Sequence, residues 1–222
     1  MHCQAGPPRY AVAVCNLYAM TRPRDAIRQL FRVGSDRTAN QPPQPAIFPD
    51  QLAPVVRVAR DGDRVMEMMR WGFPPPLNLG TRPVTNVRNT ASPYWRAWLK
   101  PEFRCLVPAT SFAEHTDSQP KVPHWFALGP DRLPFAFAGI WRPWTGTRKG
   151  ETGEHLLFAF LTTEANAVVR PVHAKAMPVI LTDETWDIWM GADTATALKL
   201  QQPLSAERLA IVATGQRQDA AI

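Results

Sequence analysis

Residues 135–141 are FAFAGIW, and residues 155–162 are HLLFAFLT. Both stretches are short, apolar and rich in aromatic residues, which is typical of strands. Six further runs, several of them alternating or β-branched, also favour strands: Val55–Val58, Val65–Trp71, Arg104–Val107, His124–Leu128, Met177–Leu181 and Leu209–Val212. The sequence therefore predicts an α+β fold in which strands dominate.

Only short helices are expected, because the 23 prolines of the chain interrupt longer ones. They are predicted to begin near Thr21, Ser92, Thr163 and Asp183. Thr21 would be the N-cap of the first helix, and Gly191 would end the last one. Residues 35–54 are polar and rich in proline, and they predict an ordered loop that wraps the core.

Composition sets broad limits. A length of 222 residues suits one domain, and a formal charge of +6 fits either a polyanionic partner or a merely solvated basic surface. No apolar run approaches the roughly 20 residues of a membrane span. Three cysteines at unrelated spacings fit neither a disulfide framework nor a zinc site, so a reducing, cytoplasmic compartment is expected.

The cysteines offer few candidates for a nucleophile. Cys105 lies in the apolar run RCLVP, where a small buried thiol is the simpler interpretation. Cys3 belongs to the N-terminal tail. Cys15 opens the folded segment beside Asn16, yet residue chemistry alone favours a structural thiol there as well.

His173 and Glu114 are candidates for moving protons. His173 precedes the strand-like run from Met177 and is expected at the mouth of a sheet, where a hydrogen-bonded histidine is commoner than a catalyst. Glu114 follows Phe112 and Ala113. Apolar surroundings would raise its pKa and suit a proton donor, whereas a salt-bridged carboxylate is the commoner outcome.

Two segments could contact a nucleic acid. Asn86 and Arg88, in TNVRNTAS, could reach a sugar or base and a phosphate, although a loop that caps a helix uses the same residue types. Trp71 and Phe73, in RWGFPPP, could stack the bases of a single strand, although aromatic residues of this kind are at least as common in a core.

The order of these segments is more informative than any one of them. From Cys15 to about Val212 the chain carries, in order, CNLY, RWGFP, TNVRNTAS, RCLVPATSFAE, WFALG, FAGIW, FLTTEAN and HAKAMPVIL. In this order they resemble the abasic-site processing family, also called SOS response-associated peptidases (SRAP). The resemblance implies one domain over residues 15–222, built as a strand-dominated mixed sheet or open barrel with short peripheral helices.

The resemblance also implies a function. The chain would recognise abasic sites in single-stranded DNA and capture them covalently, shielding the lesion during the DNA damage response. An N-terminal Cys15 would form a Schiff base through its amine and close a thiazolidine ring through its thiol; an α-amine pKa of roughly 7.7–8.0 leaves part of it unprotonated near neutrality. The implied activity is a crosslinking, lyase-type one with an associated autopeptidase, in a monomeric, nucleoid-associated protein that needs no metal or organic cofactor.

The same resemblance assigns roles to individual residues. It implies that Asn86 orients the cysteine and the opened sugar, and that Glu114 shuttles protons. His173 would hold the sugar or assist Schiff-base chemistry and strand scission. Arg88 and Lys175 would bind the phosphates that flank the lesion.

The chain departs from the family pattern in three places. Asn16-Leu17-Tyr18 stands where many members have Gly-Arg-Phe, and one extra residue separates His173 from Met177-Pro178. Fourteen residues precede Cys15, and an internal cysteine has no α-amine. Two hypotheses restore it: proteolysis, in one form by the protein itself, removes residues 1–14; or translation begins at a GTG codon read internally as Val14.

Two other functions stay open from the sequence. One is a thiol peptidase with Cys15 as nucleophile, His173 as base and Glu114 as its partner. The other is a noncatalytic module that binds single-stranded DNA, with an affinity that falls steeply with salt and does not depend on Cys15.

Overall fold

The computed structural model describes residues 15–76 and 80–219, and strands make up most of their regular structure. The extension expected over residues 1–14, with Cys3, lies outside the described residues. The strands are β1 Leu17–Met20, β2 Ser35–Asp36, β3 Gln44–Ile47, β4 Leu52–Val58, β5 Arg64–Trp71, β6 Asn86–Val87, β7 Arg104–Ala109, β8 Ser111–His115, β9 Pro123–Ala127, β10 Phe135–Arg148, β11 Glu151–Thr163, β12 Met177–Pro178, β13 Ile180–Leu181 and β14 Ala210–Thr214. The helices are α1 Arg24–Leu30, α2 Asp183–Gly191, α3 Thr194–Leu198 and the 3-10 turns η1 Pro101–Phe103 and η2 Ala206–Arg208.

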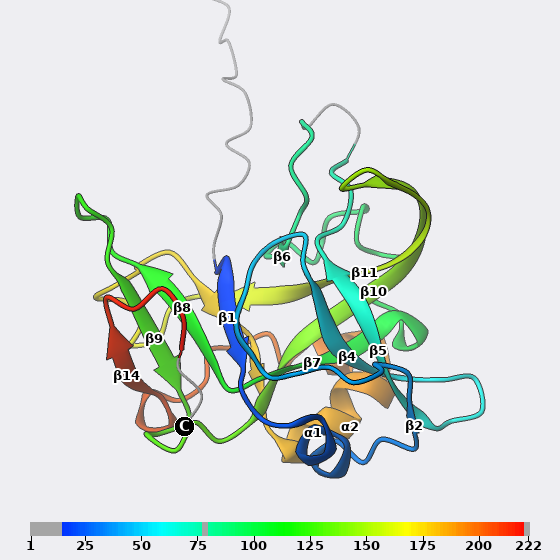
Figure 1. The fold of residues 1–222 in the computed structure, drawn as a ribbon, viewed down its shortest axis with the longest axis horizontal. Coiled ribbons are helices and arrows are strands. Elements are labelled where there is room, and N and C mark those ends of the chain that lie inside the picture. The colour runs from blue at the N-terminus through cyan, green and yellow to red at the C-terminus, as the bar shows by residue number, and fades with distance from the viewer. Residues whose placement is uncertain (1–14, 77–79, 220–222) are drawn as a thin grey trace, which may run out of the picture.

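Across the described ranges the strands form two sheets (Figure 1). A five-stranded sheet has the order β14-β9-β8-β1-β3. A nine-stranded sheet follows β12-β11-β10-β7-β4-β5-β2, with β13 attached to β10 and β6 attached to β11. β11 also pairs in parallel with β5, Phe158 opposite Trp71, which closes five strands into a barrel. The predicted strand-dominated fold with short helices is confirmed.

The two stretches on which the fold prediction depends form the β10–β11 hairpin. Arg148 pairs with Glu151, so only Lys149 and Gly150 make the turn. Their φ angles are 49° and 84°, and a two-residue turn with both φ angles positive matches the right-handed twist of the flanking strands. The hairpin extends beyond the predicted apolar runs because backbone pairing continues through the polar residues near the turn.

Aromatic rings fill the space between the two sheets. Tyr18 comes from β1, and its ring lies edge-on to those of Trp71 and Phe137, with centroid distances of 5.1 and 5.5 Å. Phe137 in turn packs on Phe160 at 4.5 Å. All four side chains are buried, and edge-to-face contacts of this kind stabilise beyond the area they bury. They hold β1 firmly against the barrel.

The helices lie together at one end of the molecule, where Figure 1 shows α1 beside α2. Phe31, directly after α1, stacks on Trp186 of α2 at 4.3 Å. Trp189 of α2 donates its indole N–H to the carbonyls of Cys105 and Gly139, at 2.9 and 3.1 Å. No helix within the described residues is long and apolar enough to cross a membrane.

Two predicted helices are wrong. The segment after Ser92 forms turns in which Trp95 N–H donates to the Ser92 carbonyl, and the following Pro101 excludes its predecessor from helical backbone. Thr163 ends β11 rather than starting a helix. α1 begins at Arg24 with Pro23 as its N-cap, two residues later than a Thr21 cap would place it.

The proline-rich segment 35–54 runs from an edge of the nine-stranded sheet to an edge of the five-stranded sheet, and it is not only a loop. It contains β2, β3 and the start of β4. β3 pairs with β1, Ile47 opposite Tyr18, and so forms an edge of the five-stranded sheet. Runs this short carry too little periodicity to be recognised as strands, because their backbone partners, rather than their own composition, determine them.

Candidate active site

Cys15 lies directly before β1, beside the end of β8. The two strands pair antiparallel with Leu17 opposite Ala113, so the chain entering β1 runs alongside the residues that leave β8. The backbone nitrogen of Cys15 donates a 2.9 Å hydrogen bond to Oε1 of Glu114. Strand register therefore joins two residues that are 99 positions apart in the chain.

Glu114 is an almost completely buried carboxyl group, 4% exposed. Burial raises its pKa well above the ordinary value, because the charged form loses its hydration. Among the described residues the ion pair of Glu114 is with His173, whose Nδ1 lies 3.9 Å from Oε2. The salt bridge that the sequence left open as an alternative is thus a single long contact. The apolar surroundings of Glu114 have the larger effect on its pKa.

His173 follows a turn, where its backbone N–H donates to the Val169 carbonyl. Its side chain is buried, and Nδ1 lies 3.1 Å from the carbonyl oxygen of Ala176. A carbonyl can only accept, so Nδ1 carries the hydrogen and Nε2 keeps its lone pair in the neutral ring. His173 is therefore held beside Glu114 with one ring nitrogen available.

Asn86 reaches Cys15 from the barrel. β6 pairs in parallel with β11, Asn86 opposite Phe160, which brings this residue to the start of β1. The Asn86 Nδ2 donates to the Cys15 carbonyl at 3.1 Å and to the Thr85 hydroxyl at 2.9 Å. The structure thus brings together Cys15, Glu114, His173 and Asn86, the four catalytic candidates.

The thiol of Cys15 is buried and protonated. Burial, reinforced by the nearby carboxyl of Glu114, raises its pKa well above the ordinary value, against a smaller lowering by the backbone of Leu17. The thiol also donates a long hydrogen bond to the Leu17 carbonyl, with Sγ 3.7 Å from the oxygen. Thiolate nucleophiles need a lowered pKa, so this environment disfavours a general thiol peptidase.

The four residues expected to bind DNA divide into two pairs. Arg88 and Lys175 are exposed, on the segments that carry Asn86 and His173. Trp71 and Phe73 are 0% exposed, and the Trp71 indole donates to the Thr85 carbonyl inside the core. Neither ring offers a face to a base, so a stacking platform at these two residues is wrong for this structure.

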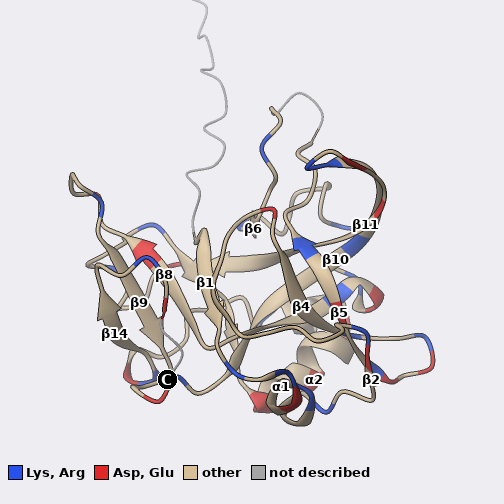
Figure 2. Ribbon diagram, in the orientation of Figure 1, with Lys and Arg blue, Asp and Glu red and all other residues tan. Residues whose placement is uncertain are grey.

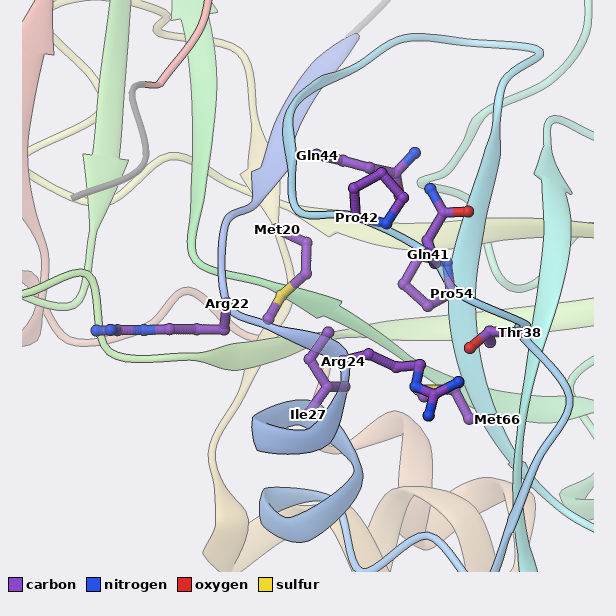
Figure 3. A pocket seen from close by; sticks show the side chains of 10 residues that line it. All are labelled: Met20, Arg22, Arg24, Ile27, Thr38, Gln41, Pro42, Gln44, Pro54 and Met66. Atoms are coloured by element: carbon purple, nitrogen blue, oxygen red, sulfur yellow. The ribbon is translucent and has the colours of Figure 1, made fainter.

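Charge and shape elsewhere in the described part of the chain add no second catalytic cluster. Figure 2 shows Lys, Arg, Asp and Glu mainly on loops and strand ends, while the middle strands are largely uncharged. A shallow pocket of about 260 Å³, open solvent included, lies between α1, β4 and the loop before β3 (Figure 3). Its arginines are already engaged, Arg22 with the Asp131 carbonyl and Arg24 with Asp36. Within residues 15–76 and 80–219 no three His, Cys, Asp or Glu side chains are grouped to hold a metal ion.

Sequence reasoning missed two residues that support this site. The Thr85 hydroxyl accepts from Asn86, and Gln201 donates to the backbone carbonyl of Arg88 at 2.9 Å. Gln201 belongs to the polar stretch LQQP, in which nothing separates it from the exposed Gln202. Only the tertiary contact identifies it.

Comparisons with known proteins identify the family of the chain. No curated protein sequence matches the chain. A solved structure of a protein from Bordetella bronchiseptica is 23% identical, with a TM-score of 0.72 over 90% of this chain and 98% of that one. A protein from Bacteroides thetaiotaomicron is 21% identical, with a TM-score of 0.71 over 88% and 90%. A phage-related protein from Bordetella bronchiseptica is 24% identical, with a TM-score of 0.67 over 92% and 95%.

At these identities the solved structures show a shared fold. The family whose description is SOS response associated peptidase (SRAP) matches residues 14–217, a range that begins beside Cys15 and includes every residue of the site. The chain therefore belongs to the SOS response associated peptidase (SRAP) family, and this membership supports a role in the SOS response that involves DNA.

Proposed function

We propose that this protein captures the aldehyde of an abasic site in single-stranded DNA as a covalent thiazolidine on Cys15. The observation that carries the proposal is the 2.9 Å contact between the Cys15 nitrogen and Oε1 of the buried Glu114. It sets a group that can give and take a proton beside the nitrogen that attacks the aldehyde. A structural cysteine needs no such group.

The reaction requires Cys15 to be N-terminal. Its unprotonated α-amine adds to the sugar aldehyde, and the carbinolamine loses water to form a Schiff base. The thiol then adds across the C=N bond of the protonated Schiff base: sulfur bonds to the former aldehyde carbon, nitrogen keeps its hydrogen, and the thiol proton passes to a base. One water is released overall, and no oxidation state changes.

Glu114 suits the proton transfers in this sequence. Burial raises its pKa, so it remains protonated at a pH where a solvated glutamate is ionised. In that form it protonates the hydroxyl that leaves the carbinolamine, and as a carboxylate it then accepts the proton of the thiol. The thiol proton returns Glu114 to its starting form, and His173 lies beside this carboxyl, with Nδ1 3.9 Å from its second oxygen.

Asn86 and the exposed basic residues position the partners. Asn86 holds the Cys15 carbonyl and so fixes the orientation of the nucleophilic residue. Arg88 and Lys175 bind the phosphates on either side of the lesion, which gives affinity without reading sequence. An abasic nucleotide has no base to unstack, so it enters the site at less cost than an intact one.

We also propose that the working chain begins at Cys15. Self-cleavage is hydrolysis: water adds to the Val14 carbonyl carbon and the Cys15 nitrogen leaves. It is favoured by the same contact, because Glu114 lies beside that nitrogen and a leaving nitrogen must be protonated. An internal start at position 14 gives the same N-terminus once the initiator methionine is removed. The intact mass of the native protein distinguishes a chain that retains residues 1–14 from one that begins at Cys15.

The proposed function is tested with single-stranded DNA that contains one natural abasic site. A chain that begins at Cys15 should form an adduct that survives denaturation, and Cys15→Ser should not. A chain that still carries Val14 before Cys15 should bind without crosslinking. Adducts from the Val14-bearing chain would overturn the amine mechanism, whereas cleavage of unrelated peptides with no adduct would favour the thiol peptidase. Salt-sensitive binding with no adduct would favour the noncatalytic module.

A further inference from the structure

The side chain of Gln201 connects three segments next to the candidate site. Its Nε2 donates to the carbonyl of Arg88 at 2.9 Å and to the carbonyl of Thr162 at 3.0 Å. Its Oε1 accepts from the Thr90 hydroxyl at 3.0 Å. This half-buried amide thus donates both of its hydrogens and accepts one hydrogen bond. Its partners are the segment that carries Arg88 and the end of β11.

These contacts begin where strand pairing stops. β6 pairs with β11 at Asn86 and Val87, opposite Phe160 and Leu161. Beyond Val87 the ladder does not continue, and the carbonyl of the fully buried Thr162 accepts from Gln201. A buried carbonyl without a donor is unfavourable, so the amide replaces the missing backbone partner. It thereby determines the path of the chain at Arg88.

The backbone of Gln201 is itself held in place. It lies in the connector that follows α3, where its N–H donates to the Leu198 carbonyl and its carbonyl accepts from the Thr163 hydroxyl. Three residues further on, the Leu204 carbonyl accepts from Asn166. The connector is therefore fixed at both ends and can act as a rigid support.

We infer that Gln201 is a positioning residue: it fixes the backbone of Arg88 and so directs the exposed guanidinium toward a DNA phosphate. Gln201 does not itself touch DNA or the reacting atoms. The inference rests on the part of the proposed function in which Arg88 binds a phosphate. It does not require that Cys15 form an adduct.

The test measures noncovalent binding by the full chain. The probe is a single-stranded oligonucleotide with one tetrahydrofuran residue, an abasic analogue that has no aldehyde and cannot crosslink. Gln201→Met keeps the size and neutral charge of the side chain but removes all three hydrogen bonds. Gln202→Met, at the exposed neighbouring position, is the matched control. Fluorescence anisotropy at several salt concentrations gives Kd and its salt dependence.

Gln201→Met should raise Kd several-fold and reduce the steepness of the salt dependence toward that of Arg88→Ala, by about 0.7 for one lost phosphate contact on a single strand. Gln202→Met should bind like the wild type. In an Arg88→Ala background, Gln201→Met should have little further effect, because two changes that act through one contact are not additive. A thermal melt of each variant establishes that it is folded. Thr90→Val, which removes only the third bond, should lie between wild type and Gln201→Met.

Equal binding by Gln201→Met and Gln202→Met would overturn the inference. A Gln201→Met effect that is undiminished in the Arg88→Ala background, or that leaves the salt dependence unchanged, would also overturn it. The outcome is separable from the proposed function. A chain that begins at Cys15 and binds this probe but forms no adduct with a natural abasic site contradicts the thiazolidine proposal, and the comparison of Gln201 with Gln202 still stands.

Discussion

The described part of the chain has two cysteines, and their burial does not show which of them is reactive. Cys15 and Cys105 are both fully buried, and burial raises the pKa of each thiol well above the ordinary value. Around Cys15 the chain places a carboxyl, an imidazole and an amide. Around Cys105 it places the wall of the barrel. The difference shows that a reactive position is defined here by groups that can move protons and not by the state of the thiol.

The surroundings of Cys105 leave no room for a substrate. A Cβ added at Gly139 would come within 2.7 Å of the Cys105 Sγ, so the opposite strand is in direct contact with the sulfur. The carbonyl of Cys105 is occupied by the indole of Trp189. Arg57, which lowers the thiol pKa slightly, pairs with Glu67. Cys105 is a packing residue, as its apolar sequence context predicts.

The largest effect should come from exchanging each sulfur for oxygen. Cys15→Ser should abolish the denaturation-resistant adduct, because an oxazolidine from a hydroxyl is a far weaker trap than a thiazolidine. Cys105→Ser should leave the adduct yield unchanged. Gel analysis of both variants with abasic single-stranded DNA makes the measurement. An adduct that persists in Cys15→Ser and disappears in Cys105→Ser would reverse the assignment.

A second large effect is expected at the carboxyl beside Cys15. Glu114→Gln keeps the size and the contact but cannot transfer a proton, so adduct formation should slow by about 10²- to 10⁴-fold, the usual contribution of general acid–base catalysis. The wild-type rate should rise with pH as the α-amine loses its proton and fall as Glu114 ionises. Glu114→Gln should lose the falling limb.

Single-turnover rates across the pH range test this expectation. Glu67→Gln is the control, since Glu67 is another buried carboxylate but pairs with Arg37 and Arg57 on the barrel. Equal slowing by both substitutions would indicate a general effect of losing a buried carboxylate, and it would remove Glu114 from the mechanism.

Much of the fold could be predicted from the sequence, because long apolar runs such as Phe135–Trp141 keep their character wherever they pack. Several of the short strands could not. β1 and β8 have four and five residues, and they are strands because each supplies the other with backbone partners. The segment after Ser92 shows the converse: its helical spacing of Trp95, Trp98 and Leu99 is real, but nearby prolines restrict it to turns.

The site was less predictable than the fold. Residue chemistry favoured a structural thiol at Cys15, and only the order of the family segments identified this cysteine as the nucleophile. Trp71 and Phe73 were misassigned because aromatic composition does not say which way a ring points. The approach of Glu114 to Cys15 depends on strand register across 99 positions, which no local pattern encodes.

A smaller effect should separate the two cysteines by stability. Cys105→Ser introduces a hydroxyl into the apolar barrel wall, and an unsatisfied buried hydroxyl costs about 1–3 kcal/mol of unfolding free energy. Cys15→Ser should cost less, because the Leu17 carbonyl and Glu114 are available as acceptors. Urea denaturation at pH 7 measures both. Equal losses would mean that the polar groups around Cys15 do not reach its side chain.

The last effect is the part of the pH dependence of stability that comes from Glu114 in the Cys15 region. Because burial raises the pKa of Glu114 in the folded protein, the folded state holds a proton that the unfolded state has released between the ordinary glutamate pKa and the raised one. The free energy of unfolding should therefore be highest below the ordinary value and fall as pH rises through the raised pKa, by at most about 1.4 kcal/mol per pH unit. Glu114→Gln is neutral throughout and should flatten this decline, whereas Glu67→Gln should not. Urea midpoints from pH 5 to 8 supply the test, and a decline that is the same with and without the Glu114 carboxyl would show that the group is already ionised in the folded protein.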